Sequence, residues 1–89
     1  MDLINNRLES RFELMTEAGP AVAEYERDGN VLVFTHTVVP REAEGRGVGG
    51  RLIAGALAQV RADGLRIAPA CSFVRAWVER HPETQDLLA

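Results

Sequence analysis

Four glycines fall within six positions of the segment Glu44–Leu52, and this cluster constrains the chain more than any other feature. They are Gly45, Gly47, Gly49 and Gly50. Such a density costs backbone entropy on folding, so a local reason for it is expected. Where glycines open a helix, the free N–H groups of its first turn form an anion site that the helix dipole favours. The cluster therefore predicts a phosphate site, to which Arg46 or Arg51 could add a charge-assisted contact. A tight turn with close helix–sheet packing is the structural alternative.

The cluster lies between a β-rich segment and a segment of helical period. Apolar and polar residues alternate before it, and apolar residues recur at helical spacing over Val48–Ala62 after it. Asp28-Gly29 favours a hairpin, and Gly64 favours the end of the helix. The predicted strands are Ser10–Met15, Ala21–Arg27, Asn30–Val39 and Leu65–Ala70. A second predicted helix contains Phe73, Val74, Trp77 and Val78 and ends at Pro82.

The predicted order of elements is β-β-β-α-β-α, which gives an α+β fold. Short turns make an antiparallel three-stranded meander of the first three strands. A right-handed crossover through the first helix then places the last strand parallel to the third. The result is a mixed sheet with helices packed against it. Because 89 residues suffice for one core only, we expect a single domain over residues 1–89, with its core at about 8–88.

Composition and charge exclude several classes of protein. Hydrophobic residues make up 46% and charged residues 26%, as in globular chains, and the net charge of −3 argues against a nucleic-acid partner. The single cysteine, Cys71, excludes an internal disulfide and a multi-cysteine zinc site. The first residues lack the regions of a signal peptide, and no apolar run is long enough to cross a membrane. We therefore expect a cytoplasmic protein without a membrane partner.

Two common phosphate-binding motifs do not fit the glycine cluster. A P-loop needs lysine and serine or threonine after its last glycine, whereas Arg51-Leu52 follow Gly50. Gly45, Gly47 and Gly50 satisfy the dinucleotide-binding spacing. However, the next predicted strand ends in Pro-Ala-Cys without the acidic residue that binds ribose, and the chain is too short for a doubly wound domain. Both motifs are excluded.

The cluster instead resembles the acyl-CoA-binding loop of the GCN5-related N-acetyltransferases, in which Gln/Arg-x-x-Gly-x-Gly/Ala opens a helix. Gly47 and Gly49 match the two small positions, whereas Glu44 stands where Gln or Arg is usual. Further segments resemble the family in order and spacing: Thr35–Pro40, Cys71–Val74 and His81–Glu83. Together they resemble a compact branch of short, stand-alone members, similar to the N-acetyltransferase domain-containing protein 1 group, over residues 10–88. Val38 departs from this branch, where Glu is often found.

The resemblance implies N-acetyl transfer from acetyl-CoA, a co-substrate, to an amine of a small molecule or a protein. In the family, the third strand here and the strand after the helix splay apart and admit pantetheine between them. Pantetheine would pair with the backbone of Thr37, Val38 and Val39, and the pyrophosphate with the N–H groups of Arg46, Gly47, Val48, Gly49 and Gly50. A backbone N–H of Val38 or Val39 would polarise the thioester, which the amine attacks directly. The resemblance does not select the acceptor.

His36 is the titratable side chain expected closest to the thioester. An imidazole suits a general base at neutral pH. Strand alternation, however, puts His36 on the same face as Phe34 and Val38, so a packed, hydrogen-bonded histidine is the structural alternative. Glu24 and Glu26 on the neighbouring strand could act through water, or be solvated carboxylates.

Cys71 follows the last predicted strand and opens the second helix. A helix N-terminus stabilises a thiolate and so lowers the pKa of a cysteine placed there. Cys71 could serve as a general acid toward the departing CoA thiolate or as an acyl-accepting nucleophile, and a small buried hydrophobe is the structural alternative. The resemblance places it next to the thioester, and the second helix has no tyrosine for the acid role that many relatives use.

The other aromatic and histidine residues have structural explanations. Phe73 and Trp77 lie at helical spacing and are predicted to form a core stripe, and His81 before Pro82 is predicted to cap a backbone carbonyl. His36 and His81 lie far apart, with no carboxylate at ligand spacing, so we predict no metal.

Two other functions stay open at this point. One is a non-catalytic CoA-binding or protein-interaction module, which Glu44 and Val38 favour. The other is a nucleotide-phosphate binder unrelated to CoA. The strands that enclose the acceptor in larger relatives have no counterpart here, and the sheet edge left exposed suggests a homodimer.

Overall fold

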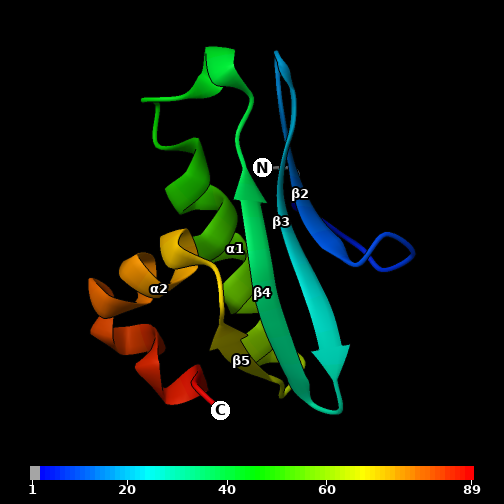
Figure 1. The fold of residues 1–89 in the computed structure, drawn as a ribbon, viewed down its shortest axis with the longest axis vertical. Helices are drawn as coiled ribbons and strands as arrows, with labels where there is room; N and C mark the ends of the chain where they lie inside the picture. Colours follow the sequence, from blue (N-terminus) through cyan, green and yellow to red (C-terminus); the bar gives the residue numbers. More distant parts are fainter. Residues whose placement is uncertain (1–2) are drawn as a thin grey trace.

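The sheet has five strands, all within residues 3–89, which the computed structural model describes (Figure 1). The strands are β1 (Leu3–Asn6), β2 (Arg11–Thr16), β3 (Gly19–Asp28), β4 (Val31–Val38) and β5 (Arg66–Pro69). They lie side by side in the order of the sequence. Strands β1 to β4 are antiparallel, and β5 is parallel to β4. The predicted α+β fold with a mixed sheet is confirmed.

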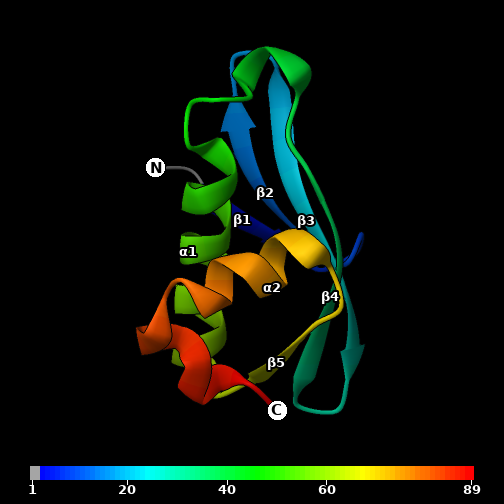
Figure 2. The ribbon, with the colours of Figure 1, turned by 60° about the vertical axis from the view of Figure 1, so that its left-hand side comes forward.

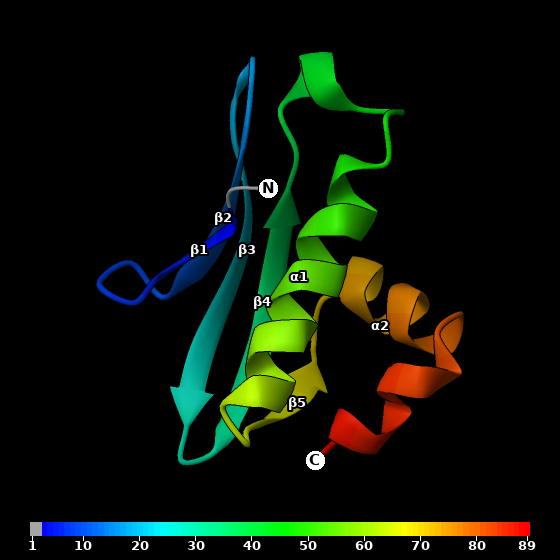
Figure 3. The ribbon, with the colours of Figure 1, turned by 180° about the vertical axis from the view of Figure 1, so that it is seen from behind.

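Both α-helices lie on the same side of the sheet (Figures 2 and 3). Helix α1 (Val48–Ala62) packs across the strands, and α2 (Ser72–Glu79) packs against α1, β4 and β5. Two short 3₁₀ helices, η1 (Arg41–Ala43) and η2 (Pro82–Leu87), precede α1 and follow α2. Helix α1 has the predicted bounds, and Gly64 follows its end with φ +69°. Within residues 3–89, no helix has the length and apolar character needed to span a membrane.

The core lies between the sheet and the two helices. Phe12, Tyr25 and Phe34 form an aromatic cluster with ring centroids 5.4 to 6.1 Å apart. The apolar stripe of α1 covers this cluster, and the largest fully buried side chains from the helices and β5 are Leu52, Ile53, Leu57, Val60, Ile67 and Val74. Trp77 is buried as predicted, whereas Phe73 is 39% exposed and lies outside the core.

Strand β1 is not predicted from the sequence. It pairs with β2 from Leu3↔Leu14 to Asn6↔Arg11, so the antiparallel part of the sheet has four strands rather than three. Leu3 packs against Gly55 of α1, and the Tyr25 hydroxyl donates a 2.6 Å hydrogen bond to Asn5. These contacts attach β1 to both the helix and the sheet.

The C-terminal residues pair with the outer edge of β5. Helix η2 turns the chain back so that Leu88 forms a parallel bridge with Ile67, and the Ala89 N–H donates to the Ile67 carbonyl at 2.9 Å. Arg61 forms a two-point ion pair with Asp86 of η2, with N–O distances of 2.7 and 2.9 Å. This edge is therefore partly covered, and the homodimer suggested by the sequence stays a prediction.

Candidate functional site

A groove of about 550 Å³ opens where the end of β4, the glycine cluster and the start of α2 meet. Thr37 and Val39 line it from the β4 side, and Phe73 lines it from α2. The remaining wall is the loop before α1 and the first turn of that helix: Ala43, Glu44, Gly45, Gly47, Val48, Gly49 and Gly50. This volume lies within the range of about 300–1,000 Å³ that is usual for small-molecule sites.

The start of α1 brings unpaired backbone N–H groups to the groove. Gly47 is the N-cap with φ +74°, and Gly45 has φ +81°, conformations that strain residues with a side chain. Among the residues that the structure describes, no side chain caps the helix. Within residues 3–89, no N–H of residues 45–50 donates a hydrogen bond to a protein group. Free N–H groups at the positive end of a helix dipole form an anion site.

The two glycines inside the first turn have different reasons for lacking a side chain. A Cβ on Gly49 would lie 2.7 Å from Cζ of Phe73, so this glycine allows the start of α2 to approach α1. A Cβ on Gly50 would lie 3.6 Å from the indole nitrogen of Trp77, which is ordinary van der Waals contact. Of these two glycines, Gly49 is the one in a close contact, and the contact is between two helices rather than the helix–sheet packing of the structural alternative.

Beyond Phe34, no strand within residues 3–89 pairs with β4 on its β5 side. The pairing with β5 runs from Val31↔Arg66 to Phe34↔Pro69, and the Cys71 N–H donates to the Phe34 carbonyl at 2.9 Å as the last link. On its other side β4 stays paired with β3 as far as Val38. The free edge of β4 therefore offers backbone groups to a ligand that lies along the groove.

A β-bulge precedes this free edge. Glu24 pairs with His36 and Tyr25 with Phe34, so Thr35 is an extra residue in β4. Bulged strands bend and twist more strongly than regular ones. Phe34 faces the core, and Thr37 and Val39 also lie on the helix side, where they line the groove. In a regular strand, residues 34 and 37 would lie on opposite faces, so the bulge changes the face on which the later side chains lie. The expectation that His36 lies on the face of Phe34 is therefore wrong.

His36 is exposed on the side of the sheet that carries no helix. Its side chain is 72% exposed, and its Nδ1 lies 3.6 Å from the Glu24 carboxylate on β3. A packed histidine, the structural alternative, is therefore excluded. Glu26, farther along β3, is exposed as the solvated alternative anticipated. The structure thus pairs His36 with one of the two predicted carboxylates and not with the other.

Cys71 lies at the groove end of α2 as its N-cap. Its Sγ is 3.5 Å from the Thr37 Oγ1. Burial acts to raise the pKa of the Cys71 thiol, but hydrogen bonds from the Thr37 hydroxyl and from the backbone N–H groups of Val74, Phe73 and Thr37 together lower it. The pKa of Cys71 is therefore lowered overall, as predicted for a cysteine at a helix N-terminus. A lower pKa increases the fraction of thiolate at neutral pH.

Replacing Thr37 with valine is expected to raise the pKa of Cys71, because it removes the hydroxyl that stabilises the thiolate. Alkylation by iodoacetamide, followed by mass spectrometry across a pH series, should shift its midpoint to higher pH. Thr35→Val is the matched control, since the Thr35 hydroxyl bonds to the Glu24 carbonyl instead. An unchanged midpoint in Thr37→Val would mean that the hydroxyl does not act on the thiol.

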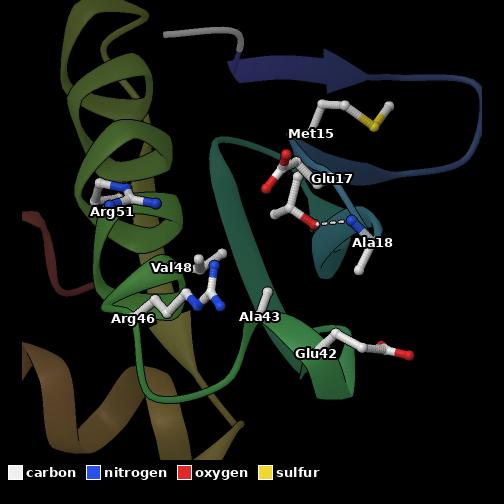
Figure 4. Close-up of a pocket in the computed structure, with 9 residues that line it drawn as sticks. Met15, Glu17, Ala18, Glu42, Ala43, Arg46, Val48 and Arg51 are labelled. Carbon is white, nitrogen blue, oxygen red and sulfur yellow. Dashed lines mark hydrogen bonds between the residues drawn. The ribbon is translucent and has the colours of Figure 1, made fainter.

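The side chains of Arg46 and Arg51 do not line the groove. Both line a neighbouring hollow beyond Ala43 and Val48, shown in Figure 4. The expected contact of these guanidinium groups with a phosphate in the groove is therefore not supported, although the backbone of Arg46 belongs to the loop. Glu44, in contrast, does line the groove.

Phe73 is the groove residue that the sequence analysis assigned wrongly, since its helical spacing to Trp77 placed it in the core. His81 caps a carbonyl as predicted, with Nδ1 2.6 Å from the Trp77 oxygen and its ring stacked on the indole. Among residues 3–89, no three His, Cys, Asp or Glu side chains gather closely enough to hold a metal ion.

Comparison with known proteins agrees with this architecture. Residues 11–87 match the family described as GCN5-related N-acetyl-transferase. A solution NMR structure of a GCN5-like protein from Staphylococcus aureus, described as a proposed N-acetyltransferase, is similar with a TM-score of 0.76 and 27% sequence identity. The similarity covers 99% of this chain and 87% of that one. No curated protein matches the chain significantly.

Proposed function

Because the chain belongs to the GCN5-related N-acetyltransferase family, we propose that it transfers an acetyl group from acetyl-CoA to an amine. One observation carries this proposal: the groove connects the unpaired N–H groups at the start of α1 with the free edge of β4. The motifs at Thr35–Pro40, Cys71–Val74 and His81–Glu83 further support a place among the short members similar to N-acetyltransferase domain-containing protein 1.

In this proposal the donor lies along the groove. The diphosphate accepts hydrogen bonds from the N–H groups of Arg46, Gly47, Val48, Gly49 and Gly50, since these groups are free to donate. Pantetheine pairs with the free edge of β4 at Thr37, Val38 and Val39. The thioester then lies near Thr37, which lines the groove and whose hydroxyl is 3.5 Å from the Cys71 Sγ.

The proposed reaction is direct attack of the amine nitrogen on the thioester carbonyl. The new C–N bond forms as the C–S bond breaks, and a backbone N–H of Val38 or Val39 stabilises the developing oxyanion. His36 takes the proton that the amine loses, and Cys71 donates a proton to the departing CoA thiolate. These two groups lie on opposite sides of β4, which suits a base on the acceptor side and an acid on the donor side.

The acceptor would approach over the sheet face that carries no helix, where His36 is exposed. This face is open to solvent and places no wall around the amine. Its openness supports either a small amine or an amine on a protein surface as the acceptor.

Titration of the ¹⁵N-labelled protein with acetyl-CoA tests the donor site. We expect the amide signals of Val38, Gly47, Gly49 and Cys71 to shift, while those of the distant turn glycine Gly29 do not. Calorimetry gives the affinity, and release of free CoA thiol with a panel of amines tests transfer. Unchanged amides at saturating acetyl-CoA in a folded protein would contradict the donor assignment.

A non-catalytic CoA-binding module is the second candidate, and the position of Glu44 favours it. Glu44 lines the groove at the position where Gln or Arg is usual, and its negative charge opposes a diphosphate bound there. Such a module would bind acetyl-CoA without releasing thiol in the presence of any amine. The binding and release measurements together therefore separate the two candidates.

Replacing His36 with glutamine is expected to lower kcat by about 10²-fold, because general-base catalysis typically contributes at least that factor. The KM for acetyl-CoA should change little, since His36 does not line the groove. Steady-state kinetics with acetyl-CoA and an amine measure both constants. Glu26→Gln, an exposed change on the same sheet, is the control; equal kcat in the His36 variant and the native protein would exclude the base role.

A further inference from the structure

A hollow of about 940 Å³ lies beside the groove, and the proposed transfer does not use it. Its walls are the tip of the β2–β3 hairpin, η1 and the start of α1 (Figure 4). It shares only Ala43 and Val48 with the groove. These two buried side chains therefore separate the two spaces.

Charges of opposite sign line opposite walls of the hollow. Arg46 and Arg51 extend into it from the start of α1, while Glu42 lies on η1 and Glu17 on the hairpin (Figure 4). Within residues 3–89, no ion pair joins either arginine to a carboxylate. The hollow thus keeps two guanidinium groups and the Glu17 carboxylate available at once, whereas the Glu42 side chain extends away from the arginines (Figure 4).

Apolar side chains lie between these charges. Met15 and Ala18 of the hairpin and Val48 of α1 contribute to the lining, and Met15 is 62% exposed. A long apolar side chain held at the surface between separated charges offers contact to the carbon skeleton of a small ligand. The lining therefore combines a cationic wall, an anionic wall and apolar surface between them.

We propose that this hollow binds a small zwitterion of the α-amino acid class, at a site separate from the donor groove. The planar guanidinium groups of Arg46 and Arg51 match a carboxylate, which they can bind through two parallel hydrogen bonds. The carboxylate of Glu17 attracts the ammonium group of the same molecule. Because these three charged side chains are exposed, the binding is weak and its affinity falls as salt is added.

The charge pattern also predicts what the hollow rejects. A simple anion such as propionate meets the arginines but is repelled by Glu17. A simple cation such as propylamine meets Glu17 but is repelled by the arginines. A molecule that carries both groups gains from both walls, so the zwitterion binds more tightly than either fragment.

Titrations of the ¹⁵N-labelled full chain at low salt test the proposal with L-alanine, propionate and propylamine as probes. L-Alanine should shift the backbone amides of Ala43 and Val48 and the side-chain Nε–H signals of Arg46 and Arg51, several-fold more tightly than either fragment. The double variant Arg46→Gln/Arg51→Gln should weaken L-alanine binding several-fold. Arg80→Gln, an exposed arginine at the end of α2, is the matched control and should bind as the native chain does.

Three results would overturn the proposal. Equal binding of propionate and L-alanine would reveal an anion site only. Loss of the L-alanine shifts in saturating acetyl-CoA would assign the arginines to the donor groove. No shift with any probe would mean that the hollow binds none of them. The proposed function is tested separately, by whether acetyl-CoA shifts the amide signals of Gly47 and Gly49. The hollow and the donor groove can therefore be disproved independently of each other.

Discussion

Replacing Gly47 with valine is expected to weaken acetyl-CoA binding by about 10³-fold. Gly47 has φ +74° at the start of α1, and a β-branched residue is strained in that conformation, so the loop must shift. A shift that removes two charge-assisted hydrogen bonds to the diphosphate, each worth about 2 kcal/mol, costs about 4 kcal/mol. At about 1.4 kcal/mol per tenfold change in affinity, this loss gives the stated factor.

Calorimetry with acetyl-CoA measures this loss, and Gly50→Ala provides the matched control. Gly50 is helical, its Cβ would meet only ordinary contact, and alanine keeps the backbone N–H. We expect Gly50→Ala to bind acetyl-CoA as the native chain does and to be more stable by less than about 1 kcal/mol. Gly47→Val should also lower the free energy of unfolding by about 1–2 kcal/mol. Native affinity in Gly47→Val would disprove the diphosphate assignment.

Replacing Phe34 with alanine should lower the free energy of unfolding by about 3–5 kcal/mol. Phe34 has no exposed surface and contacts the rings of Phe12 and Tyr25, so its removal leaves a cavity at the centre of the sheet. Domains of this kind have a total stability of about 5–15 kcal/mol, and the variant loses a large part of it. Urea unfolding followed by Trp77 fluorescence measures the change.

Val38→Ala on the same strand is the comparison for Phe34→Ala. Val38 is 53% exposed, so its truncation should cost less than about 1 kcal/mol. Comparable losses in the two variants would contradict the burial that separates Phe34 from Val38. A cost below about 1 kcal/mol in Phe34→Ala would show that the aromatic cluster does not form the core.

The elements with a strong period could be predicted from the sequence. The stripe from Val48 to Val60 has one period and ends at a glycine, so both bounds of α1 follow from local signals. The order of the strands followed from short turns and from the handedness of the crossover. Strand β1 could not be predicted, because Leu3–Asn6 is short and its pairing depends on contacts with Gly55 and Tyr25 far along the chain.

The glycine cluster indicated where the groove lies. The residues that form the other walls of the groove come from β4 and α2, and the sequence does not show how these elements pack. Phe73 and Trp77 are four residues apart, yet Phe73 is the second residue of α2 and lies over the groove, where the core has ended. The bulge is hidden for a similar reason. Apolar residues occur at both odd and even positions of Val31–Val39, so the alternation does not reveal where one residue is unpaired.

Thr35 makes β4 one residue longer than its pairing with β3 requires. Deleting that single codon would leave Phe34 opposite Tyr25 and His36 opposite Glu24, so each neighbour would keep its partner in a regular ladder. What would change is the curvature of the strand just beyond its last link with β5. The width of the opening at this end of the groove is therefore set by backbone length, and no exchange of side chains could restore it after such a deletion.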